Sequence, residues 1–156
     1  MIVLGIDPGF GRMGFGCISV IKGKTIVLDY GVVTTSGKDA FGERLVQLAD
    51  DLDELIRTHK PDRMAVEKLY FTKNAKTAMQ VAEARGVILL CAARRKVPVV
   101  EFTPSQVKSA VAGDGKADKK GMQKMVTHIL ALKRAPKLDD AADALALALC
   151  AASMRG

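Results

Sequence analysis

Short apolar segments separated by turn residues make up the first part of the chain. A continuous apolar run at residues 2–7 predicts a buried strand, and a glycine-rich turn separates it from a second predicted strand at 14–21. Over residues 25–33 apolar side chains recur at every second position, which predicts a third strand. Because the links between these segments are short, the pattern predicts an antiparallel meander.

Beyond residue 40 the apolar positions change to a helical spacing. This spacing predicts a helix over residues 41–58, Pro61 interrupts it, and residues 63–68 predict a fourth strand. The remaining expected elements are a helix at about 74–95 with Asn74 as N-cap, a short strand ending near Phe102, a helix beginning in the capping box at 103–106, a mobile glycine-rich loop at 112–116, and helices at about 118–132 and 139–153.

The order of these elements predicts an α/β fold. Strands that alternate with helices lie parallel and are joined by right-handed crossovers, with helices on both faces of the sheet. Together with the meander, this gives one mixed five-stranded sheet flanked by helices. The length of 156 residues fits one domain, which we expect to span residues 1–156.

Composition indicates the cellular setting. Cys17, Cys91 and Cys150 are odd in number and lie in apolar segments, which is typical of reduced core thiols and not of disulfides or a zinc site. No apolar run reaches the roughly 18 residues that a membrane span requires, and the N-terminus lacks a basic leader. We therefore expect a cytoplasmic protein without a membrane partner.

Four acidic residues occupy positions where a charge is costly. Asp7 and Glu67 end two predicted strands, whereas Asp140 and Asp143 are three positions apart and share one face of the last predicted helix. An unpartnered buried carboxylate costs several kcal/mol, and converging carboxylates usually bind a divalent cation. If the two strands end at one sheet edge and the helix crosses it, all four meet. The sequence thus predicts a metal site built from three parts of the chain.

The charge distribution favours a polyanionic substrate. The net charge is +7, yet residues 1–60 carry seven basic and eight acidic side chains, and residues 61–156 carry 17 basic and nine acidic ones. A basic surface around an acidic centre suits a polyanionic substrate, such as a nucleic acid, that must be both held and attacked. The alternative is an ordinary basic surface, which is also common.

The glycine-rich turn after the first predicted strand suggests two rival functions. Gly9, Gly11 and Gly14 spell the G-x-G-x-x-G of dinucleotide-binding proteins, but that motif opens a helix and here a predicted strand follows. The actin, sugar-kinase and Hsp70 group also has Asp-x-Gly at the end of its first strand. Those ATPases need two such domains, and this chain has room for one. A nucleotide-dependent enzyme is therefore disfavoured.

Several short motifs follow one another along nearly the whole chain. They are GIDPG at 5–9, AVE at 65–67, KNA and EARG within 73–86, QVK at 106–108 and DAADALALA at 140–148. In order and spacing they resemble the RuvC-type Holliday junction resolvases, or crossover junction endodeoxyribonucleases. The resemblance implies an RNase H-like fold and a homodimeric endonuclease that nicks two opposed strands of a four-way DNA junction in recombination and repair. It also implies a branch-migration motor as partner. A non-catalytic junction-binding protein of the same fold is the alternative.

By motif match, the resemblance also implies catalytic, metal-binding roles for the four acids and two Mg²⁺ ions per active site, for which Mn²⁺ can substitute. We expect Asp7 to bridge the ions because a central strand fixes it most rigidly. Asp140 and Asp143 would hold the ion that activates water, and Glu67 would complete the leaving-group side. Asp139 departs from the commoner family pattern, and we interpret it as a helix N-cap.

Aromatic and basic residues near these acids are candidates for DNA contacts. Tyr70 and Phe71 follow the strand that ends at Glu67 and suit stacking on an unpaired base, with a ring packed in the core as the alternative. Lys108 and Lys119 match basic, DNA-facing positions of the family, and Lys119, which follows the mobile loop, would be able to reach the scissile phosphate. The other candidates, which solvation alone also explains, are Arg12, Lys73, Lys76, Lys116 and Lys120.

The helix expected at 74–95 carries a stripe of small residues, and residues 87–93 are apolar on all sides. Such a helix is buried, either in the core or against another subunit. Two copies packed along this helix would form a two-fold dimer, which matches a junction that needs two equivalent cuts.

Overall fold

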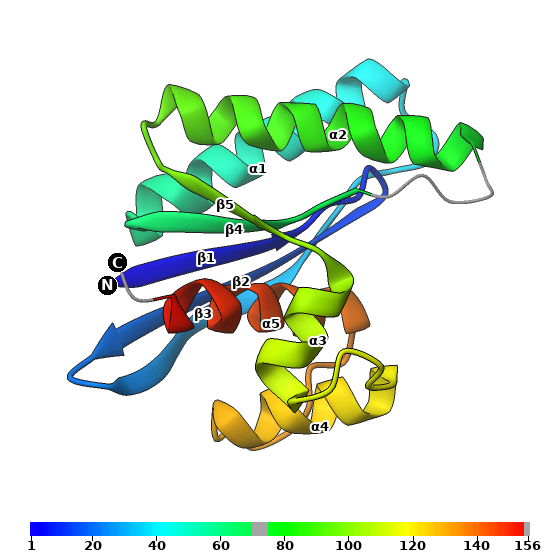
Figure 1. The fold of residues 1–156 in the computed structure, drawn as a ribbon. Coiled ribbons are helices and arrows are strands. Elements are labelled where there is room, and N and C mark those ends of the chain that lie inside the picture. Colours follow the sequence, from blue (N-terminus) through cyan, green and yellow to red (C-terminus); the bar gives the residue numbers. More distant parts are fainter. Residues whose placement is uncertain (70–74, 155–156) are drawn as a thin grey trace.

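Five strands form one mixed sheet (Figure 1). The computed structural model describes residues 1–69 and 75–154, apart from the side chains of Ala75 and Lys76. The strands are β1 (Ile2–Asp7), β2 (Arg12–Ile21), β3 (Lys24–Thr34), β4 (Arg63–Glu67) and β5 (Val99–Phe102). Their order across the sheet is β3-β2-β1-β4-β5. The pairs β1–β2 and β2–β3 are antiparallel, whereas β1–β4 and β4–β5 are parallel, so the predicted mixed α/β sheet is confirmed.

The helices follow the predicted order closely. They are α1 (Phe41–His59), α2 (Ala75–Arg94), α3 (Pro104–Ala112), α4 (Lys119–Ile129) and α5 (Asp139–Ser153). The capping box before α3 is present, because the Thr103 hydroxyl accepts from the Gln106 N–H and the Gln106 side chain accepts from the Thr103 N–H. The helix expected to reach residue 132 ends at Ile129 instead. Leu130 turns into the core, and Ala131 takes a left-handed φ of 48°, which stops the helix.

Helices cover both faces of the sheet, and each face has its own core (Figure 1). On one face α1 and α2 pack over β1, β2 and β4, with Leu4, Leu52 and Ile88 fully buried between them. On the other face α5 lies on the sheet, and α3 and α4 pack against it, around Ile18, Leu145 and Val126. Within the described residues, no helix combines the length and apolarity needed to cross a bilayer.

The helix α5 lies unusually close to the strands beneath it. A Cβ atom at Gly5 of β1 would collide with the main-chain oxygen of Ala144, and one at Gly14 of β2 would collide with that of Asp140. Helix and sheet can approach this closely only because these positions carry no side chain. Gly14 therefore serves helix packing, and not the binding of a dinucleotide. The close approach fixes the N-terminal turn of α5 over the end of β1.

Candidate active site

Two of the predicted acidic residues end neighbouring strands. Asp7 is the last residue of β1, the central strand, and Glu67 is the last residue of β4, which runs parallel to it. The register pairs Ile6 with Val66, so the two carboxylates follow at the same edge of the sheet. This is the edge at which open α/β sheets place their ligands.

The helix α5 adds the other two acids. Gly14, which pairs with Asp7 in the sheet, lies directly under the main chain of Asp140. Asp143 follows one turn later on the same face of α5. Glu67, Asp140 and Asp143 all lie near enough to Asp7 to raise its pKa. The structure thus brings all four sequence-predicted carboxylates together from three separate segments.

These carboxylates repel one another in a partly buried setting. Burial raises the pKa of Asp7 to about 8, and the charges of Glu67, Asp143 and Asp140 add to the effect, whereas Lys119 opposes it. Burial also raises the pKa of Glu67, with Asp143 adding to it, and Lys108 opposes this rise. The pKa of Asp143 rises mainly through burial too, against the nearby Lys119. When all four carboxylates are ionised, their charge exceeds what Lys108 and Lys119 neutralise, and the raised pKa values reflect this repulsion together with burial.

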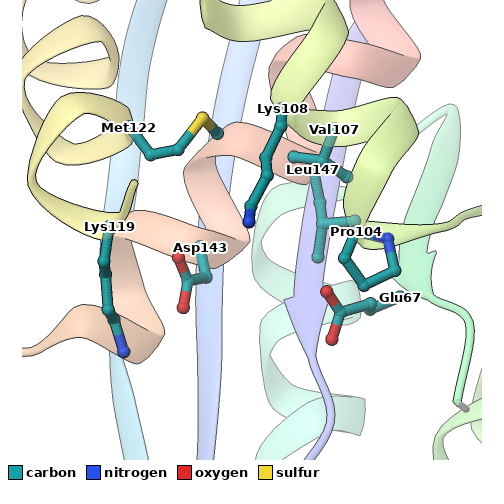
Figure 2. A pocket seen from close by; sticks show the side chains of 8 residues that line it. All are labelled: Glu67, Pro104, Val107, Lys108, Lys119, Met122, Asp143 and Leu147. Atoms are coloured by element: carbon teal, nitrogen blue, oxygen red, sulfur yellow. The ribbon is translucent and has the colours of Figure 1, made fainter. Parts of the chain in front are cut away.

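A pocket of about 220 Å³ opens between two of these acids, Glu67 and Asp143, and the helices α3 and α4. Figure 2 shows the side chains of Glu67, Asp143, Lys108 and Lys119 around it. Seen from that side, the ammonium group of Lys108 lies between the carboxylates of Glu67 and Asp143. The remaining walls are mostly apolar and come from Pro104, Val107, Met122 and Leu147. The pocket combines anionic oxygens with cationic groups, as a site for a metal and a phosphate requires.

Two exposed ion pairs flank the cluster. The Lys119 ammonium lies 2.9 Å from Oδ2 of Asp139, and Nε of Arg12 lies 3.5 Å from Oδ2 of Asp140. The interpretation of Asp139 as an N-cap is wrong, because Leu138 holds the N-cap position of α5. Asp139 is the first helical residue, where its charge is favourable at the positive end of the helix, and its side chain turns to Lys119.

The donor set fits a hard divalent cation by its chemistry. All four acids offer oxygen ligands, which Mg²⁺ prefers, and a cation would relieve their repulsion. In the parts of the chain that the structure describes, no three Asp, Glu, His or Cys side chains are arranged to hold an ion directly. The convergence of the carboxylates is thus an electrostatic observation, and ligation would involve rotation of their side chains.

Among the predicted DNA-contact residues, Arg12 pairs with Asp140, and the others divide into three groups. Lys108 and Lys119 line the pocket, as described above. Lys116 and Lys120 are exposed near the start of α4 and do not line it. Tyr70, Phe71 and Lys73, and the side chain of Lys76, lie outside the described residues.

One residue beside the site was not anticipated from the sequence. Nε of Arg85, in α2, donates to the main-chain oxygen of Glu67 at 3.2 Å, and the same guanidinium forms an ion pair with Glu101 of β5. Arg85 belongs to the EARG motif, which was the only signal available. Helical spacing alone gives no reason to link an arginine of α2 with the end of β4.

The sheet order and the carboxylates at the ends of the central strands β1 and β4 define a nuclease-type domain of the RNase H-like fold. The chain belongs to the RuvC family, since the model described as "Crossover junction endodeoxyribonuclease RuvC" matches residues 3–151.

Individual relatives cover nearly the whole chain. The crossover junction endodeoxyribonuclease RuvC of Petrotoga mobilis is 49% identical over 99% of this chain and 95% of its own length. That of Gloeobacter violaceus is 51% identical over 96% of this chain and 86% of its own. The solved structure of Thermus thermophilus RuvC in complex with Holliday junction substrate has a TM-score of 0.92 at 38% identity, covering 97% of this chain and 93% of that one.

Proposed function

We propose that this protein is a Holliday junction resolvase, a metal-dependent endonuclease that makes paired symmetric nicks in four-way DNA junctions during recombination and repair. The observation that carries the proposal is the convergence of four carboxylates at one sheet edge, in a chain of the RuvC family. The Thermus thermophilus relative, 38% identical, was solved in complex with Holliday junction substrate, which supports this choice of DNA. The single domain of residues 1–156 would carry the whole reaction.

The carboxylates divide into natural roles around two Mg²⁺ ions, for which Mn²⁺ would substitute. When bound, such ions acidify a water molecule and stabilise the leaving 3′-oxygen. Asp7, on the most central strand, would help to hold both ions. Asp140 and Asp143 on α5 would bind on the side of the attacking water, and Glu67 on that of the leaving group. All four hold their positions through the sheet and the buried α5 helix.

The basic residues would hold the DNA. Lys108 and Lys119 line the pocket and would bind the phosphate to be cut, Lys119 after exchanging its contact with Asp139 for the phosphate. Tyr70 and Phe71 would stack on bases at the junction centre. The surface cations Arg12, Lys73, Lys76, Lys116 and Lys120 would neutralise the backbone phosphates further along the DNA arms.

A homodimer would supply the two active sites that paired nicks require. The outer face of α2 is exposed and mostly apolar or small, with Met79 63% and Leu90 49% exposed, and with Glu83, Gly86 and Ala93 along the same stripe. A second copy packed on this stripe by a two-fold axis would bury it. The described cysteines are all buried free thiols, which suits a cytoplasmic location. A branch-migration motor would be a further partner on the strength of the family resemblance alone.

A non-catalytic junction-binding protein is the rival function. Such a protein would have no use for four mutually repelling carboxylates, because they weaken both its folding and its attraction for DNA. Retaining all four is therefore an argument for catalysis.

A cleavage assay tests the proposal. The purified protein is incubated with a synthetic mobile four-way junction and with linear duplex, in Mg²⁺ or in EDTA, alongside the Asp7→Asn variant. We expect symmetric nicks in the junction only, which disappear in EDTA and in the variant while binding persists. Binding without cleavage in either Mg²⁺ or Mn²⁺ would contradict the enzymatic function, and equal cutting of duplex would contradict junction specificity.

A further inference from the structure

The end of β4 is held from the side opposite the pocket. Arg85 lies in the middle of α2, and its side chain is only 20% exposed. Its Nε donates to the main-chain oxygen of Glu67 at 3.2 Å. The helices α2 and α5 cover opposite faces of the sheet (Figure 1). Arg85 therefore contacts the main chain of Glu67 from the α2 side, while the Glu67 carboxylate lines the pocket on the α5 side.

Glu67 lies where the main-chain bonding of the sheet runs out. The register between β1 and β4 ends at the pair Ile6–Val66, one residue earlier. On the β5 side Glu67 still pairs with Phe102, and the next N–H, that of Lys68, donates to the Phe102 oxygen at 2.8 Å. The hydrogen bond from Arg85 therefore supports a strand end that β1 no longer supports.

The same guanidinium reaches a second strand. Its ion pair with Glu101 connects it to β5, one residue before the strand ends. The chain then enters α3, which carries Lys108 into the pocket. One arginine thus joins three parts of the molecule: the helix α2, the strand end that carries Glu67, and the strand that leads to Lys108.

From these contacts we propose that Arg85 is a positioning residue, which sets the location of the Glu67 carboxylate and so the affinity of the site for its metal. The proposal rests on the role of Glu67 as a metal ligand, given above. Removing a group that hydrogen-bonds to a metal ligand, without touching the metal itself, typically lowers metal affinity or activity about tenfold to a hundredfold. Misplacing a reacting group by about 1 Å costs a similar factor in rate.

A purely structural role for Arg85 would have a different signature. An ion pair that only attaches α2 to the sheet would affect the melting temperature and leave the metal dependence of the folded enzyme unchanged. Arg95, just after α2, provides the matched control. It forms a two-bond pair with Asp53 of α1, at 3.2 and 3.0 Å, far along the helix from Glu67.

The experiment compares Arg85→Met with Arg95→Met in the full-length protein. For each variant, junction cleavage is measured over a range of Mg²⁺ concentrations, and the rise in melting temperature is measured over the same range without DNA. We expect Arg85→Met to raise the half-saturating Mg²⁺ concentration in both measurements by about tenfold or more. Arg95→Met should keep the wild-type values. If both variants keep wild-type Mg²⁺ dependence and cleavage rate, Arg85 has a structural role only and the proposal is overturned.

Two milder variants keep the proposal testable if Arg85→Met does not fold. Arg85→Lys keeps the charge beside Glu101 but loses the forked donor geometry, and Glu101→Gln keeps Arg85 and removes its anchor. Both should shift the half-saturating Mg²⁺ concentration in the same direction as Arg85→Met, by a smaller factor. Unshifted values in both would count against the proposal even if Arg85→Met fails to fold.

The Glu67→Gln variant separates this inference from the function on which it rests. If Glu67→Gln shifts the Mg²⁺ dependence and the Arg85 variants do not, only the positioning role is wrong. If Glu67→Gln itself leaves the Mg²⁺ dependence unchanged, Glu67 is not a metal ligand. Both the proposed site assignment and the positioning role of Arg85 are then wrong.

Discussion

The Asp7→Asn substitution tests the acidic cluster through protein stability, independently of DNA. It keeps the shape of the side chain and removes its charge. In the folded protein the pKa of Asp7 is about 8, compared with an ordinary value of 3.8. The unfolded chain therefore loses this proton at lower pH than the folded chain does. Asp7 consequently destabilises the fold progressively as the pH rises from about 4 to about 8, and has no such effect below that window.

The size of the effect follows from the raised pKa. One pKa unit corresponds to about 1.4 kcal/mol, so the roughly three units between the ordinary pKa and pH 7 set an upper limit of about 4 kcal/mol. Side-chain rotation and counter-ions reduce this penalty, and we expect Asp7→Asn to stabilise the metal-free protein by about 1–3 kcal/mol. For a chain of this length each kcal/mol raises the melting temperature by about 2–4 °C.

Thermal unfolding in EDTA at pH 5 and at pH 7.5 measures this gain, with the exposed Asp39→Asn as a matched control. The gain from Asp7→Asn should be larger at pH 7.5, because at pH 5 most of the Asp7 carboxyl groups already carry a proton. Added Mg²⁺ should raise the melting temperature of the wild type more than that of the variant. A variant that is less stable than the wild type in EDTA at pH 7.5, or whose gain does not change with pH, would refute the reasoning.

Three further predictions concern the packing of α5, the proposed dimer and the ion pair beside the pocket. Gly14→Ala forces a Cβ into the main chain of α5, and it should lower the free energy of unfolding in urea by about 1–3 kcal/mol and remove most of the cleavage activity. The control Gly42→Ala, whose Cβ meets open space in α1, should not destabilise the protein. Equal stability of the two variants would show that α5 does not need the close approach. Leu90→Asp should convert the proposed dimer to a monomer in light scattering and abolish paired nicking, with Val46→Asp of α1, which is somewhat more exposed, as control. A dimer that survives Leu90→Asp would exclude the α2 stripe as its interface. Asp139→Asn removes only an exposed ion pair, worth about 0–1 kcal/mol. The cleavage rate of this variant in single-turnover kinetics should therefore stay within about threefold of the wild-type rate. A loss as large as that of Asp7→Asn would show that Asp139 is a metal ligand.

The fold was predictable because its signals are local. Apolar alternation and helical spacing are properties of neighbouring residues, and the capping box at Thr103 marks the start of α3 without reference to the rest of the chain. The meeting of Asp7 and Glu67 was also predictable, since parallel strands end at a common edge. The sequence also placed the D-x-x-D pair on a helix at 139–153, and the structure adds that this helix, α5, lies across that edge.

Other features depend on distances that no local pattern contains. The role of Gly14 appears only when α5 is placed on β2, and the bridge from Arg85 to Glu67 joins residues on two elements across the sheet. Asp139 was assigned as an N-cap because its residue type suits that position. The backbone places the N-cap one residue earlier, at Leu138, so that Asp139 is the first helical residue and its side chain contacts Lys119.

The burial of α5 against β1 and β2 has a consequence for protein synthesis. Two of the four acids, Asp140 and Asp143, lie on this helix. It comes after all the other described elements along the chain and fills the core on its face of the sheet. A nascent chain emerging from the ribosome therefore carries Asp7 and Glu67 long before it can place Asp140 and Asp143 beside them. The acidic cluster and the second core therefore both require this helix. With the four acids as the metal ligands proposed above, the nascent nuclease would stay inert toward nearby nucleic acid until translation has passed Asp143 and α5 has packed onto the sheet.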